Sequence, residues 1–327
     1  MSVEVACAAF GLTPVAGASV SASSRGAAGQ VWRLDLGAER YAVKELFAGF
    51  DEESVRAEVT VTQHLQAAGI RLPGSVPSAT GRIVVPVATG TGERRLRLYQ
   101  WVDGVPADLA DPATAGRIGE LLARLHVDAL PAQAPADPWF EVVPDPATWD
   151  RLADAARAQG AGWGQELAGR TGLLAELAEF VTAEDPDQLV TCHRDLHPDN
   201  VLVDSEGALA VLDWDDCGPA CPDRELAAVL AFWHLDEAGQ ADEKAIRRTL
   251  AAYNAAGGPG RLRDELVFGM YVAGRLNFLH AQARLALNQD ASPENRKHAV
   301  FEISDTLARL PAPPMISHLI DLAALGH

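Results

Sequence analysis

Residues 193–200 read His-Arg-Asp-Leu-His-Pro-Asp-Asn, and thirteen residues beyond Asn200 the chain continues as Asp213-Trp214-Asp215. Short apolar runs precede and follow the first motif, and another leads into the second. The sequence therefore predicts a loop between strands, followed by a β-hairpin. Asp195 and Asn200 are five residues apart, so a tight loop ending in a hairpin brings the side chains of Asp195, Asn200 and Asp213 close together.

These residue types suit phosphoryl transfer. That reaction needs one carboxylate near the attacking hydroxyl and oxygen ligands for a Mg²⁺ ion that bridges nucleotide phosphates. One Asn and one Asp suffice, because Mg²⁺ prefers a few hard oxygens and keeps several waters. If the motif only capped turns, it would bury many polar groups between apolar strands without purpose.

A zinc site is the competing interpretation of the same motif. His193 and His197 are four residues apart, as in zinc proteases that present both histidines on one helical face. The position of the general-base Glu is occupied by Arg194, however, and Pro198 follows a segment that reads as strand and then loop. We therefore expect no zinc hydrolase.

The motif at residues 193–204, the segment 211–216, Ile118–His126 and Tyr99–Gly104 together resemble the aminoglycoside phosphotransferase and choline kinase-like family, which shares the protein-kinase fold. The resemblance implies an α+β, protein-kinase-like two-lobe fold. Residues 1–102 would form a small β-rich N-terminal, nucleotide-binding lobe. Residues 103–327 would form a larger, mostly helical C-terminal lobe with the catalytic loop and the acceptor site.

The N-terminal hundred residues are consistent with that lobe. Val31–Leu36 and Arg40–Leu46 predict a hairpin, whose second strand contains the V-A-I-K-like run ending in Lys44. Glu58 lies fourteen residues after Lys44, inside a helix expected from Asp51, as its cap, to about Ala68. We expect Lys44 to reach the α- and β-phosphates and Glu58 to pair with Lys44 and orient it.

The remaining roles follow from the resemblance. Backbone groups of Gln100 and Val102 would hold the adenine edge of a nucleotide bound between the lobes, with ATP or GTP as the phosphoryl donor. Asn200 and Asp213 would hold Mg²⁺. Asp195 would accept or orient the proton of the acceptor hydroxyl as it attacks the γ-phosphate.

The chain departs from the family's pattern in two places. Neither G-x-G-x-x-G nor a P-loop occurs, and Gly17–Gly29 offers Gly and Ser residues as a substitute phosphate loop. Arg194 stands where many antibiotic kinases carry Gly, and Asp199 is a further departure. A helix is expected from Arg224, soon after Asp213, which leaves no room for an activation segment and favours a small-molecule acceptor over a protein.

Other elements can be placed more coarsely. Asp111 as cap and Pro112 as first residue predict a helix through His126, and helices are expected from Arg224 to the end of the chain. Strands are expected over Arg82–Val87 and Arg94–Trp101 and, around the catalytic motif, over Leu189–Cys192, Val201–Val203 and Leu209–Leu212.

Composition narrows the partners. The 27 Lys and Arg residues against 45 Asp and Glu give a formal net charge of −18, which excludes general binding of nucleic acid or of anionic membrane surfaces. No apolar run approaches a membrane span. No Lys or Arg precedes Arg25, so we expect no signal peptide and a cytoplasmic protein. The four scattered cysteines agree with a reducing compartment. We expect a monomer or a homodimer.

The acceptor is the least constrained part of the prediction. Acidic side chains of the helical lobe, together with the net charge, favour a small cationic acceptor, above all an aminoglycoside or related antibiotic, which the enzyme would inactivate. Choline, homoserine and macrolides remain alternative acceptors. A nucleotide-binding regulator without transfer activity is the alternative of another class. The acidic candidates are Asp215, Asp216, Asp236, Glu237, Asp242 and Glu243.

Overall fold

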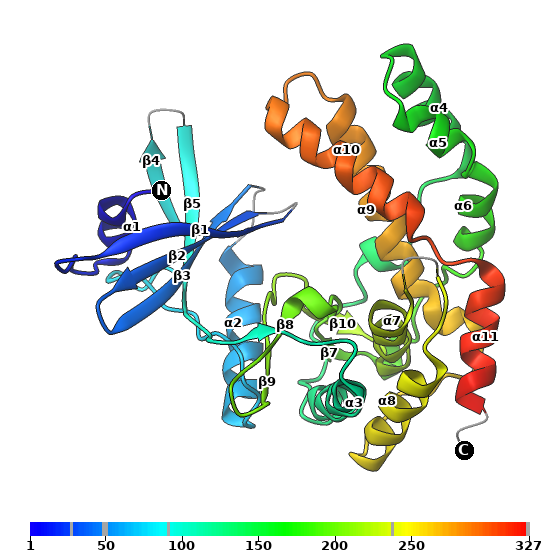
Figure 1. The fold of residues 1–327 in the computed structure, drawn as a ribbon, viewed down its shortest axis with the longest axis horizontal. Helices are drawn as coiled ribbons and strands as arrows, with labels where there is room; N and C mark the ends of the chain where they lie inside the picture. Colours follow the sequence, from blue (N-terminus) through cyan, green and yellow to red (C-terminus); the bar gives the residue numbers. More distant parts are fainter. Residues whose placement is uncertain (27–28, 48–51, 90–91, 237–238, 325–327) are drawn as a thin grey trace. The chain divides into compact units, whose positions relative to one another are not determined.

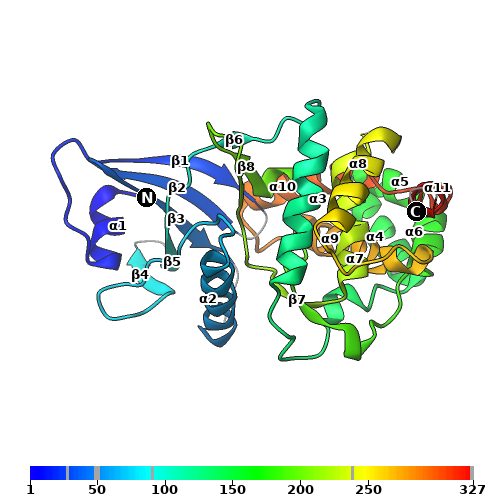
Figure 2. The same ribbon diagram turned by 90° about the horizontal axis from the view of Figure 1, so that it is seen from below.

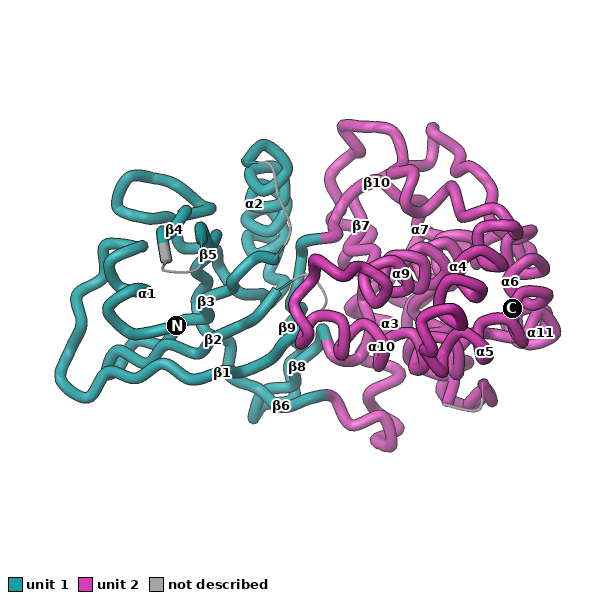
Figure 3. Tube along the Cα trace, turned by 90° about the horizontal axis from the view of Figure 1, so that it is seen from above, with its two compact units in different colours: residues 1–106, 200–215 teal, residues 107–199, 216–327 magenta. Residues whose placement is uncertain are grey.

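The structure is a computed structural model that describes residues 1–26, 29–47, 52–89, 92–236 and 239–324 (Figure 1 and Figure 2). The chain divides into two compact units (Figure 3). The first comprises residues 1–106 and 200–215, and the second comprises residues 107–199 and 216–327. The sequence analysis predicts a boundary between the lobes at residue 102 and places the hairpin after Asn200 in the helical lobe, whereas in the structure residues 200–215 belong to the first unit. No helix among the described residues is long and apolar enough to cross a bilayer.

The first unit is built on a five-stranded antiparallel sheet with the strand order β1-β2-β3-β5-β4. The hairpin of β2 and β3 turns at Gly37, whose φ of 70° is a left-handed conformation that glycine adopts without steric cost. The Ser-rich segment before this hairpin forms β1, paired to β2. The strands are β1 (Ser19–Arg25), β2 (Gly29–Leu36), β3 (Glu39–Leu46), β4 (Val85–Thr89) and β5 (Gly92–Gln100).

The two faces of this sheet differ in polarity. On one face, Leu34, Val43, Leu96 and Leu98 pack against α1 (Val3–Phe10) in a single apolar cluster. Side chains alternate along a strand, so the neighbours of Val43 and Leu96, which are Lys44 and Arg97, belong to the opposite face. That face carries the charged residues of the site, together with Glu58 of α2 (Glu52–Ala67).

A second, distant stretch of sequence completes the first unit. β8 (Val201–Val203) and β9 (Leu209–Val211) form a hairpin whose outer partner is β6 (Val105–Pro106). The Val211 N–H donates to the carbonyl of Arg71, in the segment after α2. The expected N-cap of α2, Asp51, lies outside the described residues, whereas the expected stop, Gly69, is left-handed with φ 83°. The hairpin thus reaches the same unit as Lys44.

The second unit is mostly helical. Its α-helices are α3 (Pro112–Val127), α4 (Pro146–Ala158), α5 (Trp163–Ala168), α6 (Thr171–Ala178), α7 (Pro222–His234), α8 (Glu243–Ala255), α9 (Gly269–Leu287), α10 (Pro293–Ala308) and α11 (Pro313–Ala324). The 3₁₀ turns among its described residues are η1 (Pro138–Phe140), η2 (Pro186–Gln188), η3 (Pro198–Asn200), which ends as the chain enters the first unit, and η4 (Glu265–Phe268). The α3 helix begins as predicted, with the side chain of Asp111 accepting from Ala113 N–H and with Pro112 as its first residue.

Two features of the second unit position the catalytic motif. β7 (Val190–Cys192) pairs with β10 (Gly218–Ala220) and holds the start of the motif. α3 packs closely on α8, because Gly119 has no side chain at the point where a Cβ atom would meet the carbonyl oxygen of Thr249. This close packing fixes the His126 end of α3 beneath the motif.

Candidate active site

Lys44 lies near the end of β3 and is 8% exposed. Its directly opposed partner on β5 is Arg97, which is fully buried. Two cations facing each other across a sheet would repel strongly unless carboxylates compensated them. Three carboxylates of the first unit do so, those of Glu58, Asp213 and Asp215.

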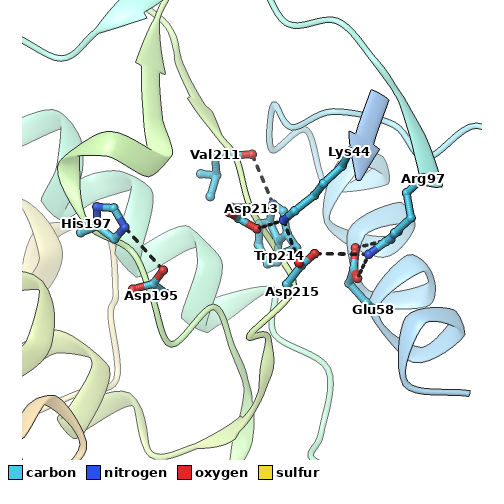
Figure 4. A network of polar contacts seen from close by, with 9 residues as sticks. All are labelled: Lys44, Glu58, Arg97, Asp195, His197, Val211, Asp213, Trp214 and Asp215. Atoms are coloured by element: carbon cyan, nitrogen blue, oxygen red, sulfur yellow. Dashed lines mark hydrogen bonds and ion pairs between the residues drawn. The ribbon is translucent and has the colours of Figure 1, made fainter. Parts of the chain in front are cut away.

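Two of these carboxylates hold Lys44. The Nζ atom of Lys44 is 2.6 Å from Oδ1 of Asp213 and 2.7 Å from Oδ2 of Asp215 (Figure 4). Burial works against the charged amine, but the charges of Asp213 and Asp215 outweigh it and raise the pKa of Lys44. Lys44 therefore stays protonated at any physiological pH and remains available to an anionic ligand.

Glu58 pairs with Arg97 and not with Lys44, contrary to the expectation from sequence. The Arg97 guanidinium donates to both oxygens of Glu58, at 2.6 and 2.8 Å (Figure 4). A third contact, at 3.3 Å, joins Arg97 to Asp215. The physical reason is geometric: a planar guanidinium matches a carboxylate with two parallel hydrogen bonds, which an amine cannot form. Asp215 is therefore shared by Lys44 and Arg97.

Asp213 and Asn200 are the expected metal ligands, and both lie in the first unit. Asp213 has φ 55°, a left-handed conformation that is strained for a residue with a side chain. Its side chain is 45% exposed, whereas that of Asp215 is 9% exposed. Asn200 is buried, and its carbonyl accepts from Leu212 N–H at 2.8 Å, which holds residue 200 beside the segment leading to Asp213. Amide and carboxylate oxygens are the donors that Mg²⁺ prefers, so this pair fits a magnesium site.

Asp195 belongs to the second unit. Its carboxylate lies 3.5 Å from Nε2 of His197 (Figure 4). Its N–H donates to Nδ1 of His193. In the same way, Asp199 N–H donates to Nδ1 of His197. The two histidines thus hold successive turns of the loop. Among the described residues, the trio of His, Cys, Asp or Glu gathered closely enough to hold a metal is His126, Cys192 and Glu225, and neither loop histidine belongs to it.

A buried anchor beneath the loop fixes its backbone. Glu225 of α7 is 1% exposed, accepts from Arg194 N–H and lies 2.8 Å from Nε2 of His126. The other ring nitrogen of His126 is 2.7 Å from the hydroxyl of Tyr253. Burial disfavours the Glu225 carboxylate, but the hydrogen bond and charge of His126 outweigh it and hold its pKa below the usual value. The loop around Asp195 is therefore tied to α3, α7 and α8.

Arg194 has φ 66°, a left-handed conformation that favours glycine. The guanidinium gives the arginine a structural role. Its Nε donates to the carbonyl of Asp216, and it lies over the ring of Phe140, 4.6 Å from the centroid. Asp137 is 3.7 Å away.

The expected adenine-binding positions lie at the end of β5 and beyond it. Gln100 N–H donates to the carbonyl of Gly74, and Tyr41 is its partner on β3. The N–H and C=O of Val102 form no hydrogen bond with any residue that the structure describes. Val102 therefore presents a donor and an acceptor of the kind that an adenine edge requires. The expected phosphate loop contains residues 27–28, which lie outside the described residues.

Most of the acidic residues proposed for acceptor binding have other partners. Asp215 is engaged by Lys44 and Arg97, and Asp236 accepts from Gln240 N–H. Asp242 caps α8, and Glu243 contacts Arg247 and His318. Glu237 lies outside the described residues. This set therefore gives little support for a carboxylate-lined acceptor site.

Sequence reasoning missed the buried contacts of Arg97 and Glu225 and the partners of Asp215. Arg97 alternates with Leu96 and Leu98, which marks it as facing away from the apolar cluster, but a solvent-facing arginine gives the same pattern. Glu225 follows Arg224 at the start of a helix, where an acidic residue is ordinary. The available signal for Glu225 was its position ten residues after Asp215, and no such signal marks Arg97.

Comparison with known proteins agrees with this geometry. Residues 19–265 match the model of the phosphotransferase enzyme family. A homoserine kinase of Beijerinckia indica subsp. indica is 29% identical over 181 residues, which cover 50% of this chain and 48% of that protein. The chain thus aligns with about half the length of this curated relative.

Solved structures share the fold over almost the whole chain. A spectinomycin phosphotransferase, solved with ADP and spectinomycin, has a TM-score of 0.67 at 14% identity and covers 99% of this chain and 97% of its own. A microcompartment-associated aminopropanol kinase has a TM-score of 0.62 at 19% identity, covering 92% and 93%. Choline kinase from Cryptosporidium parvum has a TM-score of 0.55 at 11% identity, covering 94% of both chains. The expected protein-kinase-like fold is confirmed, and the chain belongs to the phosphotransferase enzyme family.

Proposed function

We propose that the protein transfers the γ-phosphoryl group of ATP to a hydroxyl of a small acceptor that carries an amino group. The observation that supports this most is Lys44, a buried, protonated amine held between Asp213 and Asp215. Such an arrangement is suited to a nucleotide bound with a divalent cation, because the phosphates can bind the amine of Lys44 while the cation binds carboxylate oxygens.

Each residue has a distinct task in this proposal. Lys44 binds the α- and β-phosphates, and the free donor and acceptor of Val102, next to Gln100, bind the adenine edge. Asn200 and Asp213 hold Mg²⁺, which when bound neutralises the charge of the phosphate oxygens. Glu58 acts indirectly. It fixes the position of Arg97, and Arg97 in turn fixes the position of Asp215.

Asp195 receives or orients the proton of the acceptor hydroxyl. In a loose transition state the proton can leave the hydroxyl late, so a carboxylate close to the hydroxyl is sufficient. The buried contact of Glu225 with Arg194 N–H fixes the backbone directly before Asp195, and His193 accepts from Asp195 N–H. The loop backbone is thus already ordered, so that positioning Asp195 for the reaction requires little further loss of entropy.

For the acceptor, we propose a hydroxyl compound of the amino-alcohol type, as homoserine is for the similar Beijerinckia enzyme. The second candidate is an aminoglycoside or related antibiotic. The net charge of −18 favours it, because a negative field raises the association rate of polycations. We place the reaction in the cytoplasm, where ATP and GTP are both present as donors.

Product formation with purified protein tests the proposal. Mg²⁺ with ATP or GTP is incubated with amino alcohols, hydroxy amino acids, amino sugars and macrolides, and phosphorylated products are sought by mass spectrometry. Asp195→Asn keeps the shape of the side chain and should reduce kcat by about 10²- to 10⁴-fold while nucleotide binding, measured by calorimetry, is retained.

Asp199→Asn is the matched control, because Asp199 lies in the same loop and its side chain is 94% exposed. We expect its turnover to stay within about threefold of the parent. A fully active Asp195→Asn variant would contradict the catalytic assignment. Nucleotide binding without product from any acceptor class would instead favour a regulator without transfer activity.

A further inference from the structure

Arg275, in the first half of α9, has an unusual environment. The side chain is half-buried, and its Nε and Nη2 atoms are shielded from solvent without a hydrogen-bond partner among the described residues. A guanidinium removed from water without a carboxylate costs free energy, so a native structure that retains one calls for an explanation.

Other arginines with a shielded nitrogen differ in one respect. Arg25, Arg97, Arg117 and Arg194 each have one such atom. Other nitrogens of Arg97, Arg117 and Arg194 donate to Glu58, Asp111 and the Asp216 carbonyl, respectively, and the guanidinium of Arg25 lies over the ring of Phe47. Within the described ranges, Arg275 combines two shielded donors with no recorded partner for any atom of its guanidinium. Among the residues that the structure describes, no carboxylate therefore pairs with this cation.

Side-chain contacts connect the turn of α9 that carries Arg275 with the loop of Asp195. Tyr271, one turn before Arg275 on the same face of the helix, packs edge-on against Phe232 with ring centroids 5.0 Å apart. Phe232 in turn lies 5.9 Å from the ring of His197, whose Nε2 contacts Asp195. The charge of Arg275 also acts on Tyr271, where it opposes the rise in pKa that burial causes.

A second set of contacts reaches the other side of the same loop. A Cβ atom added to Gly274 would lie 3.5 Å from the ring of Phe140, and Phe140 stacks beneath the guanidinium of Arg194. Asn277 donates to the carbonyls of Trp139 and Val142, both at 2.7 Å, and so fixes α9 against this segment. Through Phe232 and Phe140, this part of α9 is thus linked to His197 and to Arg194, which lie on either side of Asp195 in the chain and belong to the same unit.

We propose that Arg275 binds a carboxylate group of the acceptor, so that the substrate is a hydroxyl compound that carries a carboxylate as well as an amino group. This inference rests on the proposed function. The planar guanidinium matches a carboxylate with two parallel hydrogen bonds, and a partner that arrives only with the substrate repays the cost of keeping the arginine unpaired. A molecule with one amino group and one carboxylate is neutral overall, so the charge of −18 does not repel it.

Matched pairs of acceptors that differ only in the acidic part test this inference. They are L-serine with ethanolamine, L-homoserine with 3-aminopropan-1-ol, and muramic acid with glucosamine, which place the hydroxyl and the carboxylate at different separations. In each pair, kcat/KM for ATP-dependent phosphorylation is compared. We expect the acid of at least one pair to be preferred by at least 10-fold, and Arg275→Gln to remove that preference by lowering kcat/KM of the acid about 10- to 100-fold.

Three controls separate binding from folding. Arg284→Gln removes an exposed arginine of the same helix and should leave the preference unchanged. Arg275→Lys keeps the charge without the two-pronged geometry and should retain part of the preference, mainly as a raised KM. The member of the pair without the carboxylate should react equally well with the parent and with Arg275→Gln, which shows that the variant is folded and that Asp195 is still active.

The outcomes distinguish this inference from the proposed function. A parent enzyme that prefers the members without the carboxylate, or that phosphorylates other hydroxyl compounds but neither member of any pair, contradicts the carboxylate site and leaves the kinase assignment intact. An acid preference that persists in Arg275→Gln assigns the carboxylate to another residue and also contradicts the inference. If no hydroxyl compound of any class is phosphorylated, the proposed function fails and the inference fails with it.

Discussion

Replacing Glu58 by Gln tests the charge network most directly. In a kinase whose phosphate-binding lysine depends on this glutamate, the variant folds normally and loses affinity for ATP. Here both oxygens of Glu58 accept from Arg97, and Lys44 is held by Asp213 and Asp215. The variant should therefore lose stability, while its affinity for ATP changes little.

The magnitude follows from burial. Arg97 is fully buried and Glu58 is 6% exposed, so solvent screening does little to weaken the pair. Removing one partner of such a pair costs about 3–5 kcal/mol, because the other charge stays buried. The remaining contact of Arg97 with Asp215, at 3.3 Å, makes the lower end of that range the better estimate. At about 2–4 °C per kcal/mol for a large domain, the melting temperature should fall by roughly 6–12 °C.

Urea unfolding followed by circular dichroism and calorimetric titration with ATP measure the two effects, with the titration done well below the melting temperature. Glu53→Gln, on the exposed side of α2, is the matched control and should change neither quantity. A double-mutant cycle with Arg97→Gln should give a coupling of about 3 kcal/mol. Unchanged stability with a tenfold weaker ATP affinity would refute the reasoning and restore Glu58 as the partner of Lys44.

Three further predictions concern single positions in the second unit. Burial lowers the pKa of His234 to about 4, whereas the pKa in the unfolded chain is about 6.5, so the folded state binds fewer protons between these pH values. The free energy of unfolding is therefore highest above pH 6.5 and decreases by about 3 kcal/mol as the pH falls to 4. His234→Gln keeps a donor toward Thr249, 2.7 Å from Nε2, and should flatten this part of a pH–stability curve measured by urea unfolding; an unchanged slope would assign the loss to other groups. Arg194→Ala and Arg194→Gly lose the same guanidinium, but a φ of 66° is strained for alanine and not for glycine. Chemical denaturation should therefore show the alanine variant to be less stable by about 1 kcal/mol, and equal stabilities would contradict strain at this residue. Gly119→Ala places a methyl group against the carbonyl of Thr249 and should lower the melting temperature by several degrees, an effect that Gly116→Ala, on an open side of the same helix, should not show.

The sequence was most informative where turn chemistry and charge pattern coincide. The loop from His193 to Asn200, the following hairpin and the Asp111 cap of α3 could be predicted, because Gly, Pro, Asp and Asn act locally at turns and helix ends. The strand that carries Lys44 could be predicted for a similar reason, since an alternating hairpin with Gly37 at its turn leaves few other interpretations.

The pairing of charges could not be predicted, because it depends on register and on which helix covers which face. The sequence shows that Arg97 alternates with Leu96 and Leu98, but not that it lies opposite Lys44 or beneath α2. Glu58 is thus correctly placed on the helix, with a partner that only the tertiary structure reveals. Likewise, no local pattern shows that residues 200–215 leave the helical part and join the sheet-containing unit.

The divided first unit has a consequence for biosynthesis. Lys44 and Arg97 leave the ribosome long before Asp213 and Asp215, which are the partners that their burial requires. At roughly 5–20 residues per second, the ribosome needs on the order of 5–20 s to proceed from the end of the first segment to the end of the hairpin. During that interval Glu58 is the one already synthesised of the three carboxylates that pair with Lys44 and Arg97 among the described residues, so the two cations are incompletely neutralised. We therefore expect the N-terminal segment to mature after the middle of the chain has been translated, and to be the part most dependent on chaperones.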